Sequence, residues 1–210
     1  MKKRFLILMM AGLLLAGCGG NADNGNVAEN DSVQNGSVTG EDETGVSDTA
    51  TSENSTENST EQEVYVLEFT DAATVDGGKM SADVFANSKL TMINVWATFC
   101  GPCINEMPDL GEIAGAYDAA DFQMIGIVSD VVEGDEDMLA EAKEIIDETG
   151  ANYPHLLLNE ELYMNLVGAS DSVPTTYFFN QEGELLGYLV GAQSKAAWEE
   201  IINGLLEEMQ

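Results

Sequence analysis

Two cysteines separated by Gly-Pro stand where a strand is predicted to end and a helix to begin. The run from residue 89 to 97 is almost continuously apolar and rich in β-formers, which is typical of a buried strand. Cys100-Gly101-Pro102-Cys103 follows it, and a helical pattern continues to about Tyr117. Unpaired backbone N–H groups at a helix start favour a thiolate. We therefore predict that Cys100 attacks disulfides and that Cys103, one turn further and more enclosed, resolves the mixed disulfide.

The same pair has three other interpretations: a static structural disulfide, half of a zinc site, or two unrelated core thiols. A closed zinc site takes four ligands, yet the sequence has no second Cys-X-X-Cys and His155 is its only histidine. A structural bridge across so short a loop would remove little chain entropy from the unfolded state. A dithiol at a strand-to-helix turn matches the redox pattern better, and we expect His155 to be structural.

Residues 64–210 carry the other strand and helix patterns and are long enough for one domain with its own core. Strands alternate with helices, and the last two strands form a hairpin that turns near Gly183. This order indicates an α/β fold with a mixed central β-sheet and helices on both faces. The further strands are predicted at 64–69, 122–128, 155–158, 175–179 and 185–190, and the further helices at 135–149, 160–167 and 194–208.

Residues 1–18 have the layout of an export signal, with basic residues at positions 2–4, an apolar run and small residues that end at Cys18. The apolar run is too short for a membrane-spanning helix. Leu15-Ala16-Gly17-Cys18 resembles the lipobox of bacterial lipoproteins, which implies that Cys18 is a lipid anchor and not a redox thiol. An ordinary secretory signal is the alternative. In both cases we expect an extracytoplasmic protein, and the anchor would hold it at the outer face of the cytoplasmic membrane.

Residues 19–63 are almost entirely polar or acidic and contain no Lys or Arg. Such a segment cannot bury enough apolar surface to offset its ordering entropy, so we expect a disordered tether with a span of roughly 35–40 Å. Residues 64–210 carry 27 acidic side chains against four lysines and no arginine. This charge excludes nucleic acid as a partner, because phosphate binding depends on Lys and Arg.

Three stretches and the order of elements carry a resemblance to a known family. The stretches are Asn94-Val-Trp-Ala-Thr-Phe-Cys-Gly-Pro-Cys-Ile-Asn-Glu-Met-Pro108, Val173-Pro174-Thr175, and Gly183 in the last turn. Together they look like the TlpA and ResA thiol-disulfide oxidoreductases, which implies a thioredoxin-like fold over most of residues 64–210. One departure is Phe99, where the family more often has Trp. We expect it to change the surface beside Cys100 and not the mechanism.

The resemblance also implies roles for the neighbours of the cysteines. Pro174 matches the cis-proline that faces the cysteines, and Val173 would offer backbone hydrogen bonds to an extended peptide. Glu106 matches an acidic residue that would accept the proton of the resolving thiol, although a glutamate there is also an ordinary partner of the helix dipole. Asn94 stands where cytoplasmic thioredoxins carry a buried aspartate, so Glu106 would substitute for that group. The substrate-binding surface is expected to include Trp96 (through one edge of a core side chain), Phe99, Gly101, Pro102, Val173 and Pro174.

The implied activity is the reduction of disulfides in exported thiol or disulfide proteins, with a CcdA-like or DsbD-like membrane electron donor that regenerates the dithiol. We expect a monomer without metal, and no cofactor beyond the redox-active Cys100–Cys103 disulfide.

Two other classes of function are weighed against this one. A peroxiredoxin shares the fold, but it places Pro and Thr or Ser ahead of its reactive cysteine and uses an Arg. Here Ile93 and Phe99 break that pattern, and residues 64–210 contain no Arg. A non-enzymatic lipoprotein would bind Cu(I) through the two thiols, or a solute. Cu(I) carriers on this fold usually bring a His that is missing here, and solute-binding proteins are usually larger.

Overall fold

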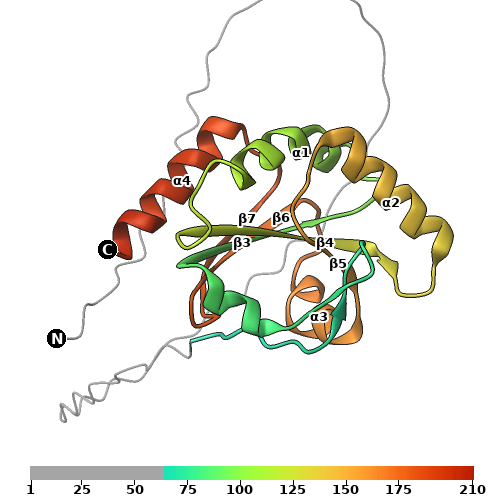
Figure 1. Cartoon of the computed structure of the whole chain (residues 1–210), viewed down its shortest axis with the longest axis horizontal. Coiled ribbons are helices and arrows are strands. Elements are labelled where there is room, and N and C mark those ends of the chain that lie inside the picture. The colour runs from blue at the N-terminus through green and yellow to red at the C-terminus, as the bar shows by residue number, and fades with distance from the viewer. Residues whose placement is uncertain (1–63) are drawn as a thin grey trace, which may run out of the picture. The chain divides into compact units, whose positions relative to one another are not determined.

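The computed structural model describes residues 64–210, which form a central sheet with helices above and below it (Figure 1). The predicted export signal, the lipid anchor on Cys18 and the tether at 19–63 lie outside the described residues and stay predictions. The elements in chain order are β1 (Ala72–Ala73), β2 (Lys79–Met80), the 3₁₀ helix η1 (Ala82–Asn87), β3 (Leu90–Trp96), α1 (Gly101–Ala114), β4 (Phe122–Val132), α2 (Glu136–Thr149), β5 (His155–Leu158), α3 (Glu160–Asn165), the 3₁₀ helix η2 (Val167–Ala169), β6 (Thr175–Asn180), β7 (Leu185–Val190) and α4 (Lys195–Glu208).

Five of the strands form one mixed sheet in the order β5-β4-β3-β6-β7. β3 runs parallel to β4, and β4 runs parallel to β5. β6 is antiparallel to both β3 and β7. The prediction of an α/β fold with a mixed central sheet is confirmed.

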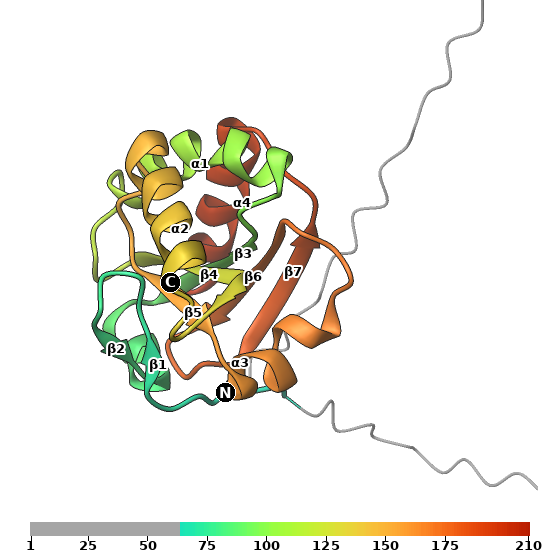
Figure 2. The ribbon, with the colours of Figure 1, turned by 90° about the vertical axis from the view of Figure 1, so that its right-hand side faces the viewer.

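Alternate residues of β3 enter two different cores, one on each face of the sheet. Met92 and Trp96 belong to the core beneath α1, α2 and α4, whereas Ile93 and Val95 belong to the core that includes α3 and η1. Figure 2 shows the three longer helices on one side of the sheet and α3 on the other. All seven residues of β3 are buried, which explains why its sequence is almost uninterruptedly apolar.

The ends of α2 follow the capping residues in the sequence. Asp135 caps the start, where its side chain accepts a hydrogen bond from the backbone N–H of Met138. Gly150 caps the end in the left-handed conformation, with φ 69°. The predicted helix at 135–149 is confirmed to within one residue.

The predicted strand at 64–69 is wrong. This segment makes one antiparallel bridge, between Val66 and Glu184, which consists of two backbone hydrogen bonds, from Leu67 N to Gly183 O (3.0 Å) and from Leu185 N to Tyr65 O (2.8 Å). Because it pairs only with the turn between β6 and β7 and the start of β7, it lacks a partner strand along its length. The alternation that suggested a strand reflects the burial of Leu67 and Phe69 in the core on the α3 side.

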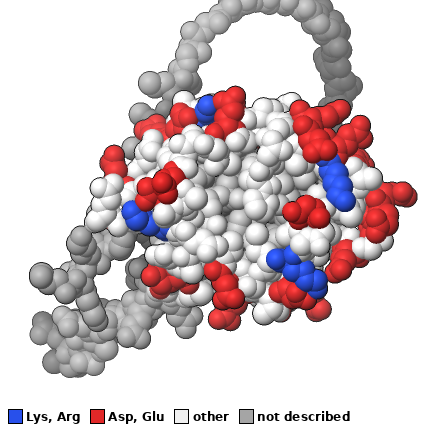
Figure 3. Space-filling view, in the orientation of Figure 1, with Lys and Arg blue, Asp and Glu red and all other residues white. Residues whose placement is uncertain are grey.

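The surface is strongly acidic, and the lysines stand next to carboxylates. Figure 3 shows acidic side chains around the edge of one face and an area without charge in its centre. Three of the four lysines form exposed ion pairs, which join Lys79 to Asp71, Lys89 to Asp121, and Lys195 to Glu112. Among residues 64–210, no helix is both long enough and apolar enough to cross a membrane.

Candidate active site: a disulfide at the start of α1

Cys100 and Cys103 form a disulfide at the start of α1, with their Cα atoms 5.3 Å apart. Cys100 is the N-cap of this helix, and its sulfur accepts a hydrogen bond from the backbone N–H of Cys103 at 3.2 Å. Cys100 keeps 5% of its surface exposed, whereas Cys103 is fully buried. The same N–H group and the helix start would stabilise a thiolate on Cys100 after reduction, and Cys100 is the more exposed of the two cysteines.

Asp130 fixes the loop that carries Cys100. Its carboxylate accepts hydrogen bonds from the backbone N–H of Thr98, at 3.0 and 3.1 Å, and from the Thr98 hydroxyl at 2.7 Å. Ser129 donates to the carbonyl of Trp96 at 3.0 Å. Sequence analysis missed both residues. No local signal in the sequence marks them, because they reach the loop after β3 through the parallel pairing of Trp96 with Val128.

His155 supports Trp96 from below the site. Its Nδ1 accepts a hydrogen bond from the indole N–H of Trp96 at 3.1 Å, and its Nε2 lies 2.9 Å from the carbonyl oxygen of Ala151. Nε2 therefore carries the proton and the ring is neutral. Burial lowers the pKa of His155 to about 4. The ring also stacks on Tyr153, with centroids 4.4 Å apart, and it occupies the space that a side chain at Gly126 would fill.

Glu106 lies in the core on the same side of the sheet as α1. Its carboxylate accepts hydrogen bonds from the side-chain amide of Asn94 at 3.2 Å and from the backbone N–H of Gln193 at 3.1 Å. The Asn94 amide also donates to the Thr176 hydroxyl at 3.0 Å. Burial raises the pKa of Glu106, and the two hydrogen bonds offset only part of that effect. Asn94 and Glu106, which the resemblance linked, are therefore in direct contact.

The loop before β6 lies beside the cysteine loop. Thr175 pairs with Val95 near the end of β3, so the residues before Thr175 run past the residues after Trp96. The peptide bond between Val173 and Pro174 is cis. The predicted contact of Val173 with a substrate backbone stays a prediction.

The residues predicted to bind substrate divide into an exposed and a buried group. Phe99 is 78% exposed, and Gly101 and Pro102 are also at the surface. Trp96 is fully buried, as expected for a core side chain, and its predicted contact with substrate stays a prediction. Its indole edge points to His155, which comes from β5, two strands away from β3 in the sheet. Within residues 64–210, no cluster of three or more His, Cys, Asp or Glu side chains could hold a metal ion.

Comparisons with known proteins agree with this geometry. The AhpC/TSA family matches residues 64–187. Thiol-disulfide oxidoreductase ResA of Bacillus thuringiensis is 24% identical over 111 residues, which are 53% of this chain and 60% of ResA. Thioredoxin-like protein YneN of Bacillus subtilis is 28% identical over 127 residues, which are 60% of this chain and 71% of YneN. A thiol:disulfide interchange protein of the thioredoxin family from Chlorobium tepidum has a TM-score of 0.58 and 26% identity, and covers 67% of this chain and 94% of its own.

The chain thus spans less than two thirds of the length of this ResA. The similarity to ResA and the thioredoxin-like fold, both expected from the sequence, are confirmed. Since the family match at residues 64–187 spans more than half of the sequence, the chain belongs to the AhpC/TSA family.

Proposed function

We propose that this protein is a thiol-disulfide oxidoreductase that reduces disulfides in other proteins. The observation that carries the proposal is the disulfide at the N-cap of α1, with one slightly exposed and one fully buried cysteine. The relatives named as thiol-disulfide oxidoreductases support it.

The cycle starts from the reduced pair. The Cys100 thiolate attacks one sulfur of the partner's disulfide, which forms a mixed disulfide and releases the other partner sulfur as a thiolate. Cys103 then loses its proton and attacks the sulfur of Cys100, so the second partner sulfur leaves and the Cys100–Cys103 disulfide closes. Two electrons and two protons pass to the partner, and a second dithiol must return them to this protein.

We propose that Glu106 takes the proton of Cys103. The two residues are three positions apart on α1, hence on the same side of the helix, and both are buried. A carboxyl group whose pKa is raised by burial accepts a proton more readily than an ordinary glutamate at neutral pH. The Gln193 N–H and the Asn94 amide hold it in place without neutralising it.

The place of action belongs to the same proposal. We infer an extracytoplasmic enzyme, held at the outer face of the cytoplasmic membrane through Cys18, that acts on exported thiol or disulfide proteins. Its electron donor would be a membrane dithiol protein of the CcdA or DsbD kind. The lipobox-like stretch before Cys18 supports the location, and the Gly-Pro pair between the reactive cysteines supports the reducing direction.

Trapping of the partner tests the exchange reaction. In cells that make the full chain, a Cys103→Ser variant should accumulate mixed disulfides on Cys100, because the resolving step is lost. A Cys100→Ser variant is the matched control and should trap none. Failure of the Cys103→Ser variant to hold any partner that the control lacks would refute the exchange role.

Two solution measurements test direction and the competing functions. A reduction potential of about −250 mV or lower supports a reductase. A potential of about −120 mV, which is the value of the oxidant DsbA, would refute the reducing direction. A peroxiredoxin would consume peroxide as fast as its own thiols are oxidised. A Cu(I) carrier would bind copper tightly and exchange disulfides poorly. We expect neither behaviour.

A further inference from the structure

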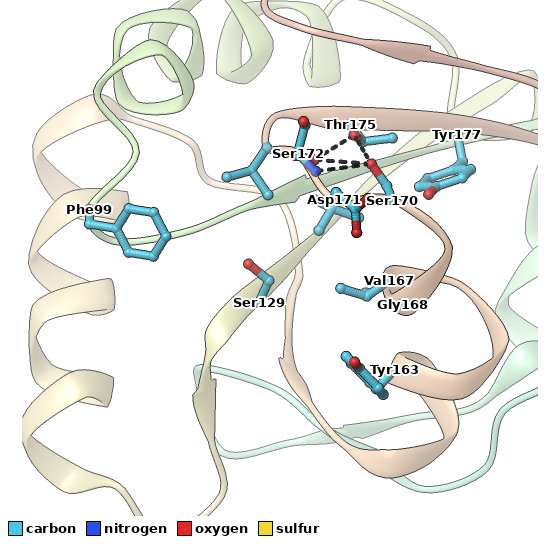
Figure 4. A pocket seen from close by; sticks show the side chains of 12 residues that line it. Phe99, Ser129, Tyr163, Val167, Gly168, Ser170, Asp171, Ser172, Thr175 and Tyr177 are labelled. Carbon is cyan, nitrogen blue, oxygen red and sulfur yellow. Dashed lines mark hydrogen bonds between the residues drawn. The ribbon is translucent and has the colours of Figure 1, made fainter.

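A hollow of about 290 Å³ opens next to Phe99, the residue before Cys100, on the side of the sheet that carries α3. Phe99 lines one end of it, Tyr163 and Val167 line another, and the loop that leads to Pro174 contributes Asp171 (Figure 4). Pockets that enclose drug-sized ligands measure roughly 300–1,000 Å³. The volume of this hollow lies just below that range, so it is suited to one side chain.

The lining has a specific chemistry. It includes three aromatic rings, those of Phe99, Tyr163 and Tyr177, and one charged group, the carboxylate of Asp171. Figure 4 shows that carboxylate directed from its loop into the hollow, towards Val167. An occupant that satisfies this lining carries a positive charge and can stack on aromatic rings.

The loop that presents Asp171 is fixed by hydrogen bonds on both sides of it. The hydroxyls of Ser170 and Thr175 lie 2.9 Å apart, and the Thr175 hydroxyl donates to the carbonyl of Ser172 at 2.7 Å. Asp171 itself is exposed. The backbone on both sides of Asp171 is thus fixed, and none of the hydrogen bonds within this loop involves the Asp171 carboxylate.

No cation of the described domain reaches this carboxylate. Residues 64–210 contain four lysines, of which three form ion pairs with Asp71, Asp121 and Glu112, and none of the four lines the hollow. A positive charge that pairs with this carboxylate would therefore come from outside residues 64–210. Arginine fits better than lysine, because its planar guanidinium can stack on aromatic rings and can form a bidentate ion pair with a carboxylate.

We propose that this hollow receives an arginine side chain of the partner protein, close in sequence to the cysteine that exchanges with Cys100. The inference rests on the proposed exchange function and specifies its substrates: exported proteins whose reactive disulfide is flanked by arginine. Phe99 and Val173 connect the hollow to the site, since one precedes Cys100 and the other precedes Pro174.

Disulfide-bridged peptides test the proposal with the reduced full chain. The series carries arginine, its neutral analogue citrulline, or glutamate within a few residues of the attacked cysteine. A fourth peptide carries the same arginine at its far end, because the net negative charge of the domain attracts every cationic peptide. We expect the peptide with the nearby arginine to react about three- to tenfold faster than the citrulline and far-end peptides.

Two variants locate the effect. Asp171→Asn should bring the ratio between the arginine and citrulline peptides close to one. Glu207→Gln, which removes the same charge from an exposed position near the end of α4, should leave that ratio as it is. If the wild type exchanges with all four peptides equally, or if both variants lower the ratio alike, the arginine site is refuted while the exchange function stands. If the wild type reacts with none of them, both proposals fail.

Discussion

Replacing Gly126 with alanine tests how firmly the histidine beneath the active site is held. A Cβ at this position in β4 would lie 2.1 Å from Nδ1 of His155 and 2.7 Å from its Cε1, closer than real Cβ contacts allow. The ring cannot step aside freely. It is hydrogen-bonded at both nitrogens and packed between Trp96 and Tyr153.

The expected cost follows from the contacts that would break. Two hydrogen bonds of the ring contribute about 1 kcal/mol each, and the Trp96 indole N–H, left buried without an acceptor, adds about 1–3 kcal/mol. Alanine in place of glycine in a strand recovers roughly 0.5–1 kcal/mol. The Gly126→Ala variant should therefore lose about 2–4 kcal/mol of unfolding free energy.

Urea unfolding of the oxidised chain, followed by tryptophan fluorescence, measures this loss. Gly187→Ala in β7 is the matched control, because a Cβ at that glycine meets nothing within 4 Å. It should change the unfolding free energy by less than about 1 kcal/mol. A double variant, Gly126→Ala with His155→Ala, removes the clash and should lose less than the sum of the two single variants. Equal stability of the Gly126→Ala and Gly187→Ala variants would refute the reasoning.

Three other predictions concern buried charge and the cysteine loop. Because burial lowers the pKa of His155 from 6.5 to about 4, the unfolded chain binds the proton first, so stability falls as the pH drops through that window. A His155→Gln variant should lose this slope in urea unfolding, and an unchanged slope contradicts the assignment. Burial raises the pKa of Glu106, so its contribution to stability is present at low pH and is lost as the pH rises through the folded-state pKa. Glu106→Gln should accordingly be at least as stable as the wild type at alkaline pH and yet resolve mixed disulfides about 100-fold more slowly in stopped-flow assays; an unaltered rate argues against a proton acceptor. Asp130→Ala should cost about 1–3 kcal/mol of unfolding free energy by freeing the Thr98 donors, whereas Asp147→Ala on exposed α2 should be nearly neutral, and similar losses in both variants would contradict the role of Asp130.

Local signals in the sequence were sufficient for most elements and for the reactive pair. Asp135 and Gly150 marked the ends of α2, and the apolar run before Cys100 marked β3. The contact between Asn94 and Glu106 was accessible through the resemblance and agrees with the alternation of β3, which turns Asn94 to the side of α1.

The contacts that the sequence could not predict join residues from segments that become neighbours only in the folded chain. His155 reaches Trp96 only because β5 and β3 both pair with β4, and Gly126 in β4 leaves room between them. Asp130 reaches Thr98 through the register of β3 with β4. The alternation at 64–69 is that of an extended segment that buries two side chains, and the missing partner strand becomes visible only in the folded chain.

Asn94 and Val95 are consecutive in β3, yet one faces Glu106 and the other lines the hollow beside α3. If both proposals hold, proton transfer and the recognition of a partner side chain take place on opposite surfaces of a single strand. A protein engineer who wished to retarget such an enzyme would vary exposed lining residues such as Tyr163 and Asp171 and keep Leu166, which belongs to the core. Natural lineages have the same freedom, so substrate choice is expected to diverge faster than the catalytic apparatus.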